Sequence, residues 1–269
     1  MNTVRKILFV CLAVICLGAI GFGGYYIVSQ QSREKNYENL TQEVHTTSAP
    51  EEKQETQSPP DTVEPTATPE PTATVEPLVI PIDFTKLQAE NPDIYAWIQI
   101  PDTKVDDPIA QSATDNSYYL NHTVAGDSGL PGSIYTENIN KKDFSDNNTV
   151  IYGHNMRDGS MFGGLSQYMD SAYMQAHPQI IIYTPEHRYT YQVFGGITYD
   201  DRHIPATYNC QDLTQFQAFL DSLSGVRNMQ TYLNSDLTVT TADRILTLST
   251  CTSNSQERFL VEAVLVHEE

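Results

Sequence analysis

The feature that most limits what this chain can fold into is a polar, proline-rich stretch over residues 29–77. It ends in the imperfect repeat EPTATPEPTATVEP and holds almost no large apolar side chain. Such a segment buries too little apolar surface to offset its loss of conformational entropy, and its prolines favour an extended, semi-stiff spacer. We therefore expect a disordered stalk here, which leaves residues 78–269 of the 269-residue chain to form one domain with a hydrophobic core.

The segment that precedes this stalk is apolar. Residues 7–28, ILFVCLAVICLGAIGFGGYYIV, are uncharged, and about 22 residues suffice to cross a hydrocarbon core of roughly 30 Å as a helix. Arg5 and Lys6 come before the run, so we expect a cytoplasmic N-terminus over residues 1–6 and an extracellular domain after the span. A cleaved signal peptide is the alternative, but the run is long for one and no A-x-A-like site follows. The predicted localisation is the cell membrane, with a single pass.

Charge and cysteine content narrow the possible partners. The chain has a formal net charge of −19, and acidic residues also outnumber basic ones within residues 78–269. This balance argues against binding to nucleic acid or to anionic lipid, and we interpret it as surface solubility. Outside the apolar run the cysteines are Cys210 and Cys251. A disulfide-stapled extracellular domain normally carries more, so we expect free thiols, with a Cys210–Cys251 bridge as the alternative.

Residues 78–269 contain many short β-type runs and few helical ones. Helices are predicted over 83–90 and over DLTQFQAFLDSLSG, which Asp212 or Thr214 caps and Gly225 closes. SMFGGLSQYMDSAYMQAH also has helical spacing. Apolar runs bounded by turn residues predict strands in YAWIQIP, KVDDPIAQ, GSIYTE, NTVIYGH, QIIIYTPEHRYTYQVFGGITYD, DRILTLSTC and RFLVEAVLVHE. Because strands and helices do not alternate regularly, we expect a mainly β fold with peripheral helices, a closed or nearly closed mixed β-barrel.

Cys251 stands where such a strand ends. It closes TLSTC and precedes the polar TSNSQE, so its thiol can be held rigidly and still be reached. Nucleophilic cysteine chemistry needs a thiolate, a histidine to share the proton and a donor for the developing oxyanion. His154 ends the apolar run NTVIYGH, whereas the other histidines of this part lie in loops, turns or at the C-terminus. Taken alone, a strand-end histidine is more often structural than catalytic.

Arg258 begins the run that follows Cys251. If residues 252–257 form a hairpin, its guanidinium returns to the end of the sheet that carries the thiol, where a cation stabilises a thiolate and an oxyanion. A solvated arginine at the start of a strand is the alternative, and the spacing alone favours it.

Together, TLSTC, YGHN and ERFLVEAVLV resemble the sortase family of Gram-positive surface transpeptidases, and the similarity spans residues 83–267. TLSTC in place of TLITC, the helix before YAWIQIP and the helix-bearing insert DLTQFQAFLDSLSG are similar to class B members. The resemblance implies a sortase-like closed mixed β-barrel with an N-terminal helix and with that insert before the last two strands. Such enzymes also carry an anchor and a stalk.

The resemblance also implies a mechanism and a site. Cys251 is the implied nucleophile, His154 the general acid and base, and Arg258 the group that stabilises the oxyanion and positions the substrate. The implied substrates are surface proteins with a C-terminal sorting signal, of Asn-Pro-x-Thr type in class B, which are cleaved after Thr. The implied acceptor is an amine of a peptidoglycan precursor or cross-bridge. The implied substrate-binding residues are Asn116, Leu120, Tyr199, His203, Ile204, Ser249 and Thr252.

Other functions remain open at this point. A thiol hydrolase would use the same three residues with water as acceptor, and an inactive stalked binding domain would keep only the barrel. Pilus-assembling enzymes often carry a lid and a second membrane segment, and the end LVHEE favours wall anchoring instead. The sequence has no C-x-x-C or H-x-x-x-H spacing, no Ca²⁺ loop and no phosphate-binding glycine loop, so we expect no metal and no cofactor.

Overall fold

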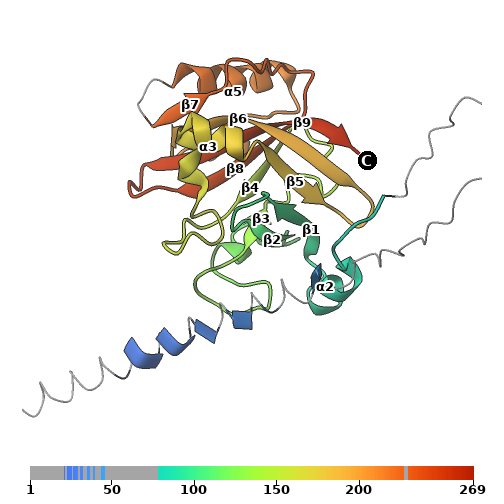
Figure 1. Cartoon of the computed structure of the whole chain (residues 1–269), viewed down its shortest axis with the longest axis vertical. Helices are drawn as coiled ribbons and strands as arrows, with labels where there is room; N and C mark the ends of the chain where they lie inside the picture. Colours follow the sequence, from blue (N-terminus) through green and yellow to red (C-terminus); the bar gives the residue numbers. More distant parts are fainter. Residues whose placement is uncertain are drawn as a thin grey trace, which may run out of the picture.

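The computed structural model describes residues 78–269 apart from 227–229, together with scattered positions between 21 and 45 (Figure 1). The predicted N-terminus (1–6), most of the predicted anchor (7–28) and most of the predicted stalk (29–77) lie outside the described residues. Among those that are described, no helix combines the length and the apolar character needed to cross a bilayer. The prediction of a single-pass protein of the cell membrane is corrected accordingly, since the structure gives it no support.

The strands of the described part form one mixed sheet that closes into a barrel (Figure 1). They are β1 (Ile94–Gln99), β2 (Asp106–Ala110), β3 (Ile134–Thr136), β4 (Asn148–Tyr152), β5 (Gln179–Tyr183), β6 (Arg188–Asp200), β7 (Thr231–Leu233), β8 (Ile245–Cys251) and β9 (Glu257–Glu268). Their order is β5-β1-β2-β3-β4-β8-β9-β6-β7, and an additional β5–β6 pairing closes the barrel and leaves β7 on the edge of β6. The β2–β3 and β4–β8 pairs are parallel. The predicted mainly β, closed mixed barrel is confirmed.

Short helices surround this barrel. They are α2 (Phe84–Glu90), η1 (Tyr118–Leu120), η2 (Leu165–Met169), α3 (Ser171–Ala176), α4 (Ile204–Thr207) and α5 (Leu213–Gly225). The two predicted helices begin where capping requires, because Asp83 accepts a hydrogen bond from the Lys86 N–H and Asp212 accepts from the Thr214 N–H. The sequence did not predict α4 or β7, which are only a few residues long.

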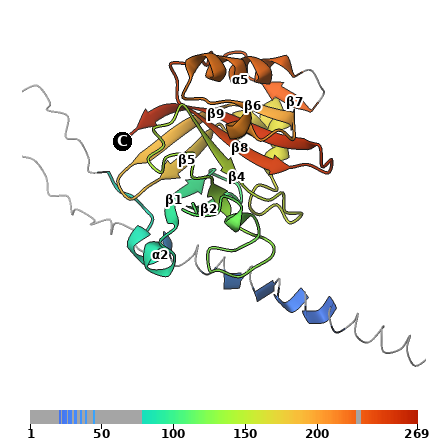
Figure 2. The ribbon, with the colours of Figure 1, turned by 180° about the vertical axis from the view of Figure 1, so that it is seen from behind.

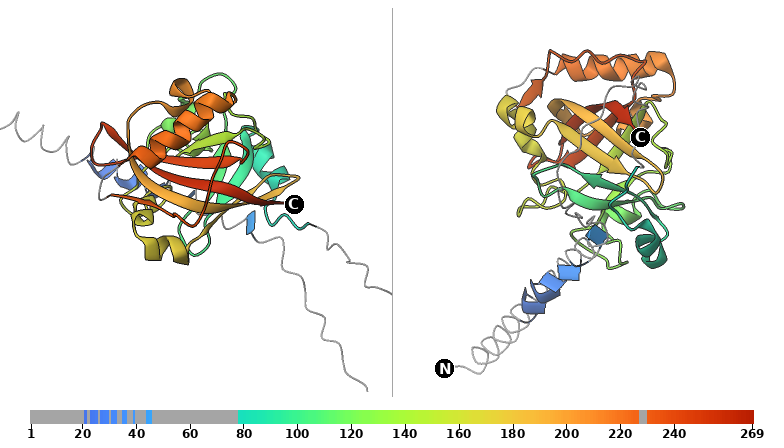
Figure 3. Two further views of the ribbon diagram at one scale, coloured as in Figure 1. Left: turned by 90° about the horizontal axis from the view of Figure 1, so that it is seen from above. Right: turned by 45° about the vertical axis from the view of Figure 1, so that its right-hand side comes forward.

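The two predicted helices cover opposite parts of the barrel. Helix α5 lies on the outside of the sheet over β6 and β9 (Figure 3, left), and its Phe216 and Phe219 share one hydrophobic cluster with Ile197 and Leu260 of these strands. Helix α2 lies beside β1 at the other end of the molecule, next to the fully buried Trp97 (Figure 2). The α5 layer matters for the site because it covers the outer face of β8 and β9.

Alternation along β8 decides which of its side chains face the barrel interior. Leu246 and Leu248 are buried in the interior cluster, whereas Ile245 packs in the outer cluster beneath α5. Successive side chains of a strand point to opposite faces, so Thr247, Ser249 and Cys251 follow Ile245 to the outer face. Cys251 therefore lies at the end of β8 on the outside of the barrel.

An acidic side chain is buried on this same outer face. Glu262 of β9 is 0% exposed, and its carboxyl lies 2.9 Å from the hydroxyl of Thr247, its partner in the β8–β9 ladder. That hydroxyl also donates to Asn148 Oδ1 at 3.0 Å. Burial raises the pKa of Glu262 to about 8, although the Thr247 contact opposes the shift. A protonated Glu262 can itself donate to Thr247, which leaves the single Thr247 hydrogen for Asn148.

Glu262 predicts that stability falls as the pH rises. The pKa in the folded state, about 8, lies above that of an unfolded Glu, so this contribution is complete below the unfolded pKa and is lost as the pH rises through the folded one. The Glu262→Gln variant cannot ionise. The variant's free energy of unfolding minus that of wild type should be larger at pH 9 than at pH 5, by roughly 1–3 kcal/mol. Urea unfolding of both proteins at these pH values measures the difference, and a pH-independent gap would contradict the prediction.

Candidate active site

A pocket of about 380 Å³ opens at the ends of β4, β8 and β9. Segments that are far apart in the sequence meet around it, because neighbouring strands of the barrel end at this edge. Its lining residues are Leu120, Tyr135, Glu137, Tyr152, Gly153, His154, Asp200, Asp201, Arg202, His203, Ile204, Ser249, Thr250, Cys251, Arg258 and Leu260.

Cys251 and Arg258 face each other across the β8–β9 ladder. They are paired in its antiparallel register, and directly opposite residues of such a pair have Cβ atoms about 4.5–5.5 Å apart. The Cys251 thiol is free and exposed. Arg258 Nη1 donates to the carbonyl oxygens of Ser255 at 3.1 Å and Glu257 at 2.8 Å. The backbone of the hairpin loop therefore holds the guanidinium in the pocket that Cys251 also lines.

His154 reaches the pocket from the parallel neighbour of β8. In that pairing Tyr152 lies beside Ser249, and the same register carried two residues further brings His154 beside Cys251. The Thr250 hydroxyl donates to the Gly153 carbonyl at 2.7 Å, and Asn155 Nδ2 donates to the Cys251 carbonyl at 2.7 Å. These bonds tie the two strand ends together, so that ring and thiol line one pocket.

A backbone carbonyl holds the imidazole of His154. Its Nε2 lies 2.6 Å from the Leu120 carbonyl oxygen, which can only accept, so Nε2 carries a proton. The nitrogen that remains for chemistry is Nδ1. Gly132 allows the two groups to approach, since it has φ +66° and a Cβ there would lie 2.7 Å from the Leu120 oxygen and 3.1 Å from His154 Cδ2.

Aromatic rings and a contact between His203 and Glu137 form a further wall of the pocket. Tyr135 stacks on Tyr152 with ring centroids 5.3 Å apart, and Tyr152 stacks on His203 at 6.5 Å. Burial, with smaller effects of Glu137 and Cys251, raises the pKa of Tyr135 to about 12. Burial and then Glu137 also raise the pKa of Tyr152, so both phenols stay neutral at physiological pH. His203 Nε2 lies 2.7 Å from Glu137 Oε1.

The structure brings most of the residues predicted from the sequence into this pocket. The members present are Cys251, His154, Arg258, Leu120, His203, Ile204 and Ser249. The hairpin on which the placement of Arg258 depended is formed by β8 and β9. Cys210 and Cys251 are both free thiols, so the structure does not contain the alternative disulfide between them.

Three predicted substrate-binding residues are not among the described residues that line the pocket. Asn116 accepts a hydrogen bond from the Asn138 N–H at 2.9 Å. Tyr199 is 4% exposed, because β6 continues through it and its hydroxyl contacts Ser222 of α5 at 2.6 Å. The Thr252 hydroxyl is engaged with the backbone of its own turn, at Asn254.

The sequence reasoning missed several lining residues. Glu137 follows a short apolar run, as His154 does. Strands that end at one edge of a sheet bring their last residues together, and this pattern could have identified Glu137. Tyr135 and Tyr152 lie inside strands and gave no such signal. Asp200 lies beside Arg202, whose Nε donates to it at 2.6 Å, and this bond holds the pKa of Asp200 below its usual range.

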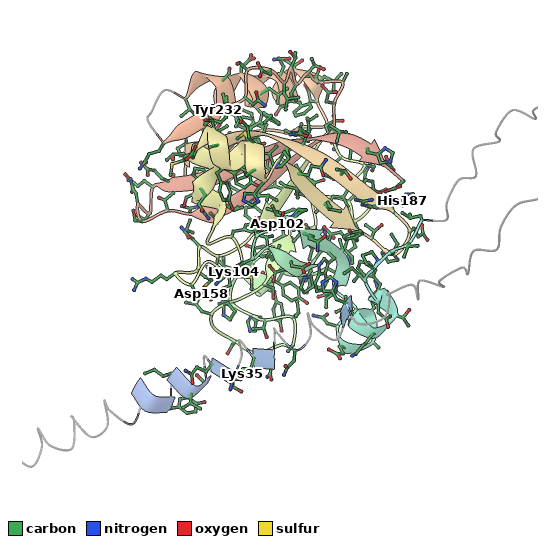
Figure 4. The ribbon with its side chains drawn as sticks, viewed as in Figure 1. Lys35, Asp102, Lys104, Asp158, His187 and Tyr232 are labelled. Carbon is green, nitrogen blue, oxygen red and sulfur yellow. The ribbon has the colours of Figure 1, made fainter. Side chains whose placement is uncertain are left out.

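A separate cavity of about 370 Å³ lies between the β1–β2 turn and residues 158–177. Figure 4 shows Asp102, Lys104 and Asp158 in this region, and Lys104 Nζ donates to the Asp158 carbonyl at 2.6 Å. In the part of the chain that the structure describes, none of the predicted site residues lines this cavity, and no group of three or more side chains could hold a metal ion.

Comparison with known proteins agrees with the fold. The Sortase domain family model matches residues 98–266. Sortase B of Listeria monocytogenes is 36% identical over 185 residues, which cover 67% of this chain and 72% of that protein.

Solved structures give the same result. Sortase B from Bacillus anthracis in complex with AAEK1 has a TM-score of 0.60 and 33% identity, and the match covers 68% of this chain and 83% of that one. The Staphylococcus aureus sortase B–substrate complex has a TM-score of 0.59 and 30% identity, with 68% and 84% covered. Since the matched residues include the strands that carry the cysteine, the histidine and the arginine, the chain belongs to the sortase family of cysteine transpeptidases, class B.

Proposed function

We propose that this transpeptidase cleaves a C-terminal sorting motif of surface proteins after Thr and transfers the protein to an amine of the cell wall. The observation that carries the proposal is the pairing of Cys251 with Arg258 in one ladder, beside His154 in the same pocket. The catalytic unit that we propose comprises residues 78–269. A relative solved as a complex with its substrate, the Staphylococcus aureus sortase B, supports a peptide as the occupant of the pocket.

In the first half of the proposed reaction, the Cys251 thiolate attacks the carbonyl carbon of the Thr. The Arg258 guanidinium stabilises the negative oxygen of the tetrahedral intermediate, with help from backbone N–H groups near Cys251. The C–N bond then breaks, and His154 as imidazolium gives its Nδ1 proton to the leaving amine. The N-terminal part of the substrate stays on Cys251 as a thioester.

In the second half, an amine attacks the thioester carbon and replaces the sulfur. His154 takes the proton of the attacking amine, and the C–S bond breaks to form the new amide and to release Cys251. The preferred motif is of Asn-Pro-x-Thr type, in line with the class. The pocket suits a peptide that carries a hydroxyl and apolar groups, because apolar lining such as Ile204 and Leu260 lies next to Arg258.

The role of Cys251 predicts the loss of all turnover when its sulfur is removed. The full-length protein is incubated with an Asn-Pro-x-Thr peptide library and with oligoglycine or a diaminopimelate peptide as acceptor. We expect Cys251→Ala to lower kcat/KM by about 10³-fold or more, because the covalent route is lost, and Cys210→Ala to keep it. Product mass distinguishes amide from free acid, and hence transfer from hydrolysis. Equal turnover by Cys251→Ala and wild type would refute the proposal.

The role of Arg258 predicts that lysine cannot replace it. Lysine keeps the charge but lacks the planar fork, so we expect Arg258→Lys to lower kcat/KM by about 10²-fold while the protein stays folded. Arg244→Lys is the matched control, because Arg244 precedes the opposite end of β8 and pairs with Glu268. Steady-state kinetics with the best library peptide measure both variants. If Arg258→Lys and Arg244→Lys behave alike, the assigned role is wrong.

A further inference from the structure

Helix α4 separates the active-site pocket from a smaller cavity. Ile204, its first residue, lines the pocket that contains Cys251 and also a cavity of about 90 Å³ that borders Asn148 and Cys210. The Ile204 side chain is buried, so it forms part of the partition between the two spaces. The position of α4 therefore decides how far the substrate pocket extends.

Helix α4 cannot hold this position by itself. It spans only Ile204–Thr207, and a single helical turn has no stability of its own in water. The turn before it is exposed, and the Asp200–Arg202 bond within that turn joins neighbours in sequence. Contacts with the barrel must therefore keep α4 in place.

Glu137, at the end of β3, stands on firmly held backbone. The buried amide of Gln111 donates to the carbonyl oxygens of Glu137 at 3.0 Å and of Asn140 at 2.9 Å. The Asn138 N–H donates to Asn116 Oδ1 at 2.9 Å. The backbone is thus fixed at Glu137 and on its C-terminal side, so the Glu137 side chain projects from a fixed position.

A side-chain contact joins this fixed point to α4. Glu137 Oε1 accepts a hydrogen bond from His203 Nε2 at 2.7 Å, and the Glu137 side chain is only 14% exposed. His203 is the N-cap of α4, and its carbonyl accepts the hydrogen bond of the Thr207 N–H at 3.0 Å. Its ring also stacks on Tyr152 of β4. The start of α4 is therefore bound to the ends of β3 and β4.

We propose that Glu137 is a positioning residue: through His203 it holds α4 against the barrel, so that Ile204 closes the substrate pocket towards the second cavity. Without this contact α4 lifts, and the pocket loses a wall. Peptide binding then weakens, while the chemistry of a bound peptide changes little, because Cys251 and Arg258 stand on β8 and β9 and the Leu120 carbonyl holds the ring of His154. The kinetic part of this inference rests on the proposed function, and the position of α4 does not.

Cys210 serves as a reporter of that position. It is a half-buried free thiol on the second cavity, and burial raises its pKa to about 11. Lifting α4 admits water, so a thiol reagent reacts faster. In the full-length Cys251→Ala protein we expect iodoacetamide to alkylate Cys210 about fivefold faster after Glu137→Ala, and less so after Glu137→Gln, which keeps an acceptor oxygen. Peptide mass spectrometry assigns the label to Cys210.

A double-mutant cycle tests whether His203 transmits the effect. We expect His203→Ala to accelerate alkylation as much as Glu137→Ala does, and the double variant to add nothing further, because both changes remove one contact. Glu186→Ala is the matched control, since Glu186 is an exposed acid in the β5–β6 turn, and it should leave the rate unchanged. Additive effects of Glu137→Ala and His203→Ala would contradict the proposal.

Kinetics with Cys251 intact separate positioning from a structural role. We expect Glu137→Ala to raise KM for the best library peptide about fivefold, with kcat within about twofold of wild type. Glu137→Gln preserves the side-chain volume and covers the case in which the alanine variant fails to fold. Alkylation of Cys210 at the wild-type rate in each folded variant would overturn the proposal, even if wild type turns over peptide normally. Failure of wild type to turn over peptide would overturn the proposed function, and the alkylation rates would still decide the role of Glu137.

Discussion

The register between β4, β8 and β9 is the constraint on which the rest of the site depends. In this register Cys251 is opposite Arg258, and Tyr152 lies beside Ser249, two residues before His154 and Cys251. Because side chains alternate along a strand, a slip of one residue in β8 would turn the thiol into the barrel and Leu248 out of it. The interior packing of Leu246 and Leu248 therefore specifies the position of the Cys251 thiol as firmly as any contact within the pocket.

The outer face that carries the thiol opens onto the pocket at one end and is buried beneath α5 at the other. Near the pocket it presents Ser249 and Cys251, and beneath α5 it presents Thr247 and Glu262, which satisfy each other within a hydrogen-bonded row. Thr247 and Glu262 are fully buried, which is why the carboxyl there keeps its proton near neutral pH. One sheet face thus serves both as the floor of the site and as the base of the α5 layer.

Sequence reasoning predicted well those features that depend on neighbours in the chain. The capped helices, the strand runs and the hairpin that returns Arg258 follow from local patterns, and so does the strand-end position of Cys251 and His154. The parallel β4–β8 pairing joins segments almost a hundred residues apart, and no local pattern reveals it. For the same reason Glu137 escaped notice, since only the closed barrel brings it to His203. Tyr199, predicted to bind substrate, lies near the end of the predicted strand β6, and only the packing of that strand against α5 places its side chain outside the pocket lining.

The bond between His154 Nε2 and the Leu120 carbonyl has a consequence for the order of events. With one ring nitrogen occupied by the backbone, the imidazole cannot pass a proton from one side of its ring to the other. In the proposed reaction the departing amine and the incoming amine must then use the same ring nitrogen, and they cannot both stand there at once. The first product has to leave before the acceptor enters, so this single hydrogen bond reinforces the double-displacement, ping-pong sequence that the thioester already requires of the two substrates.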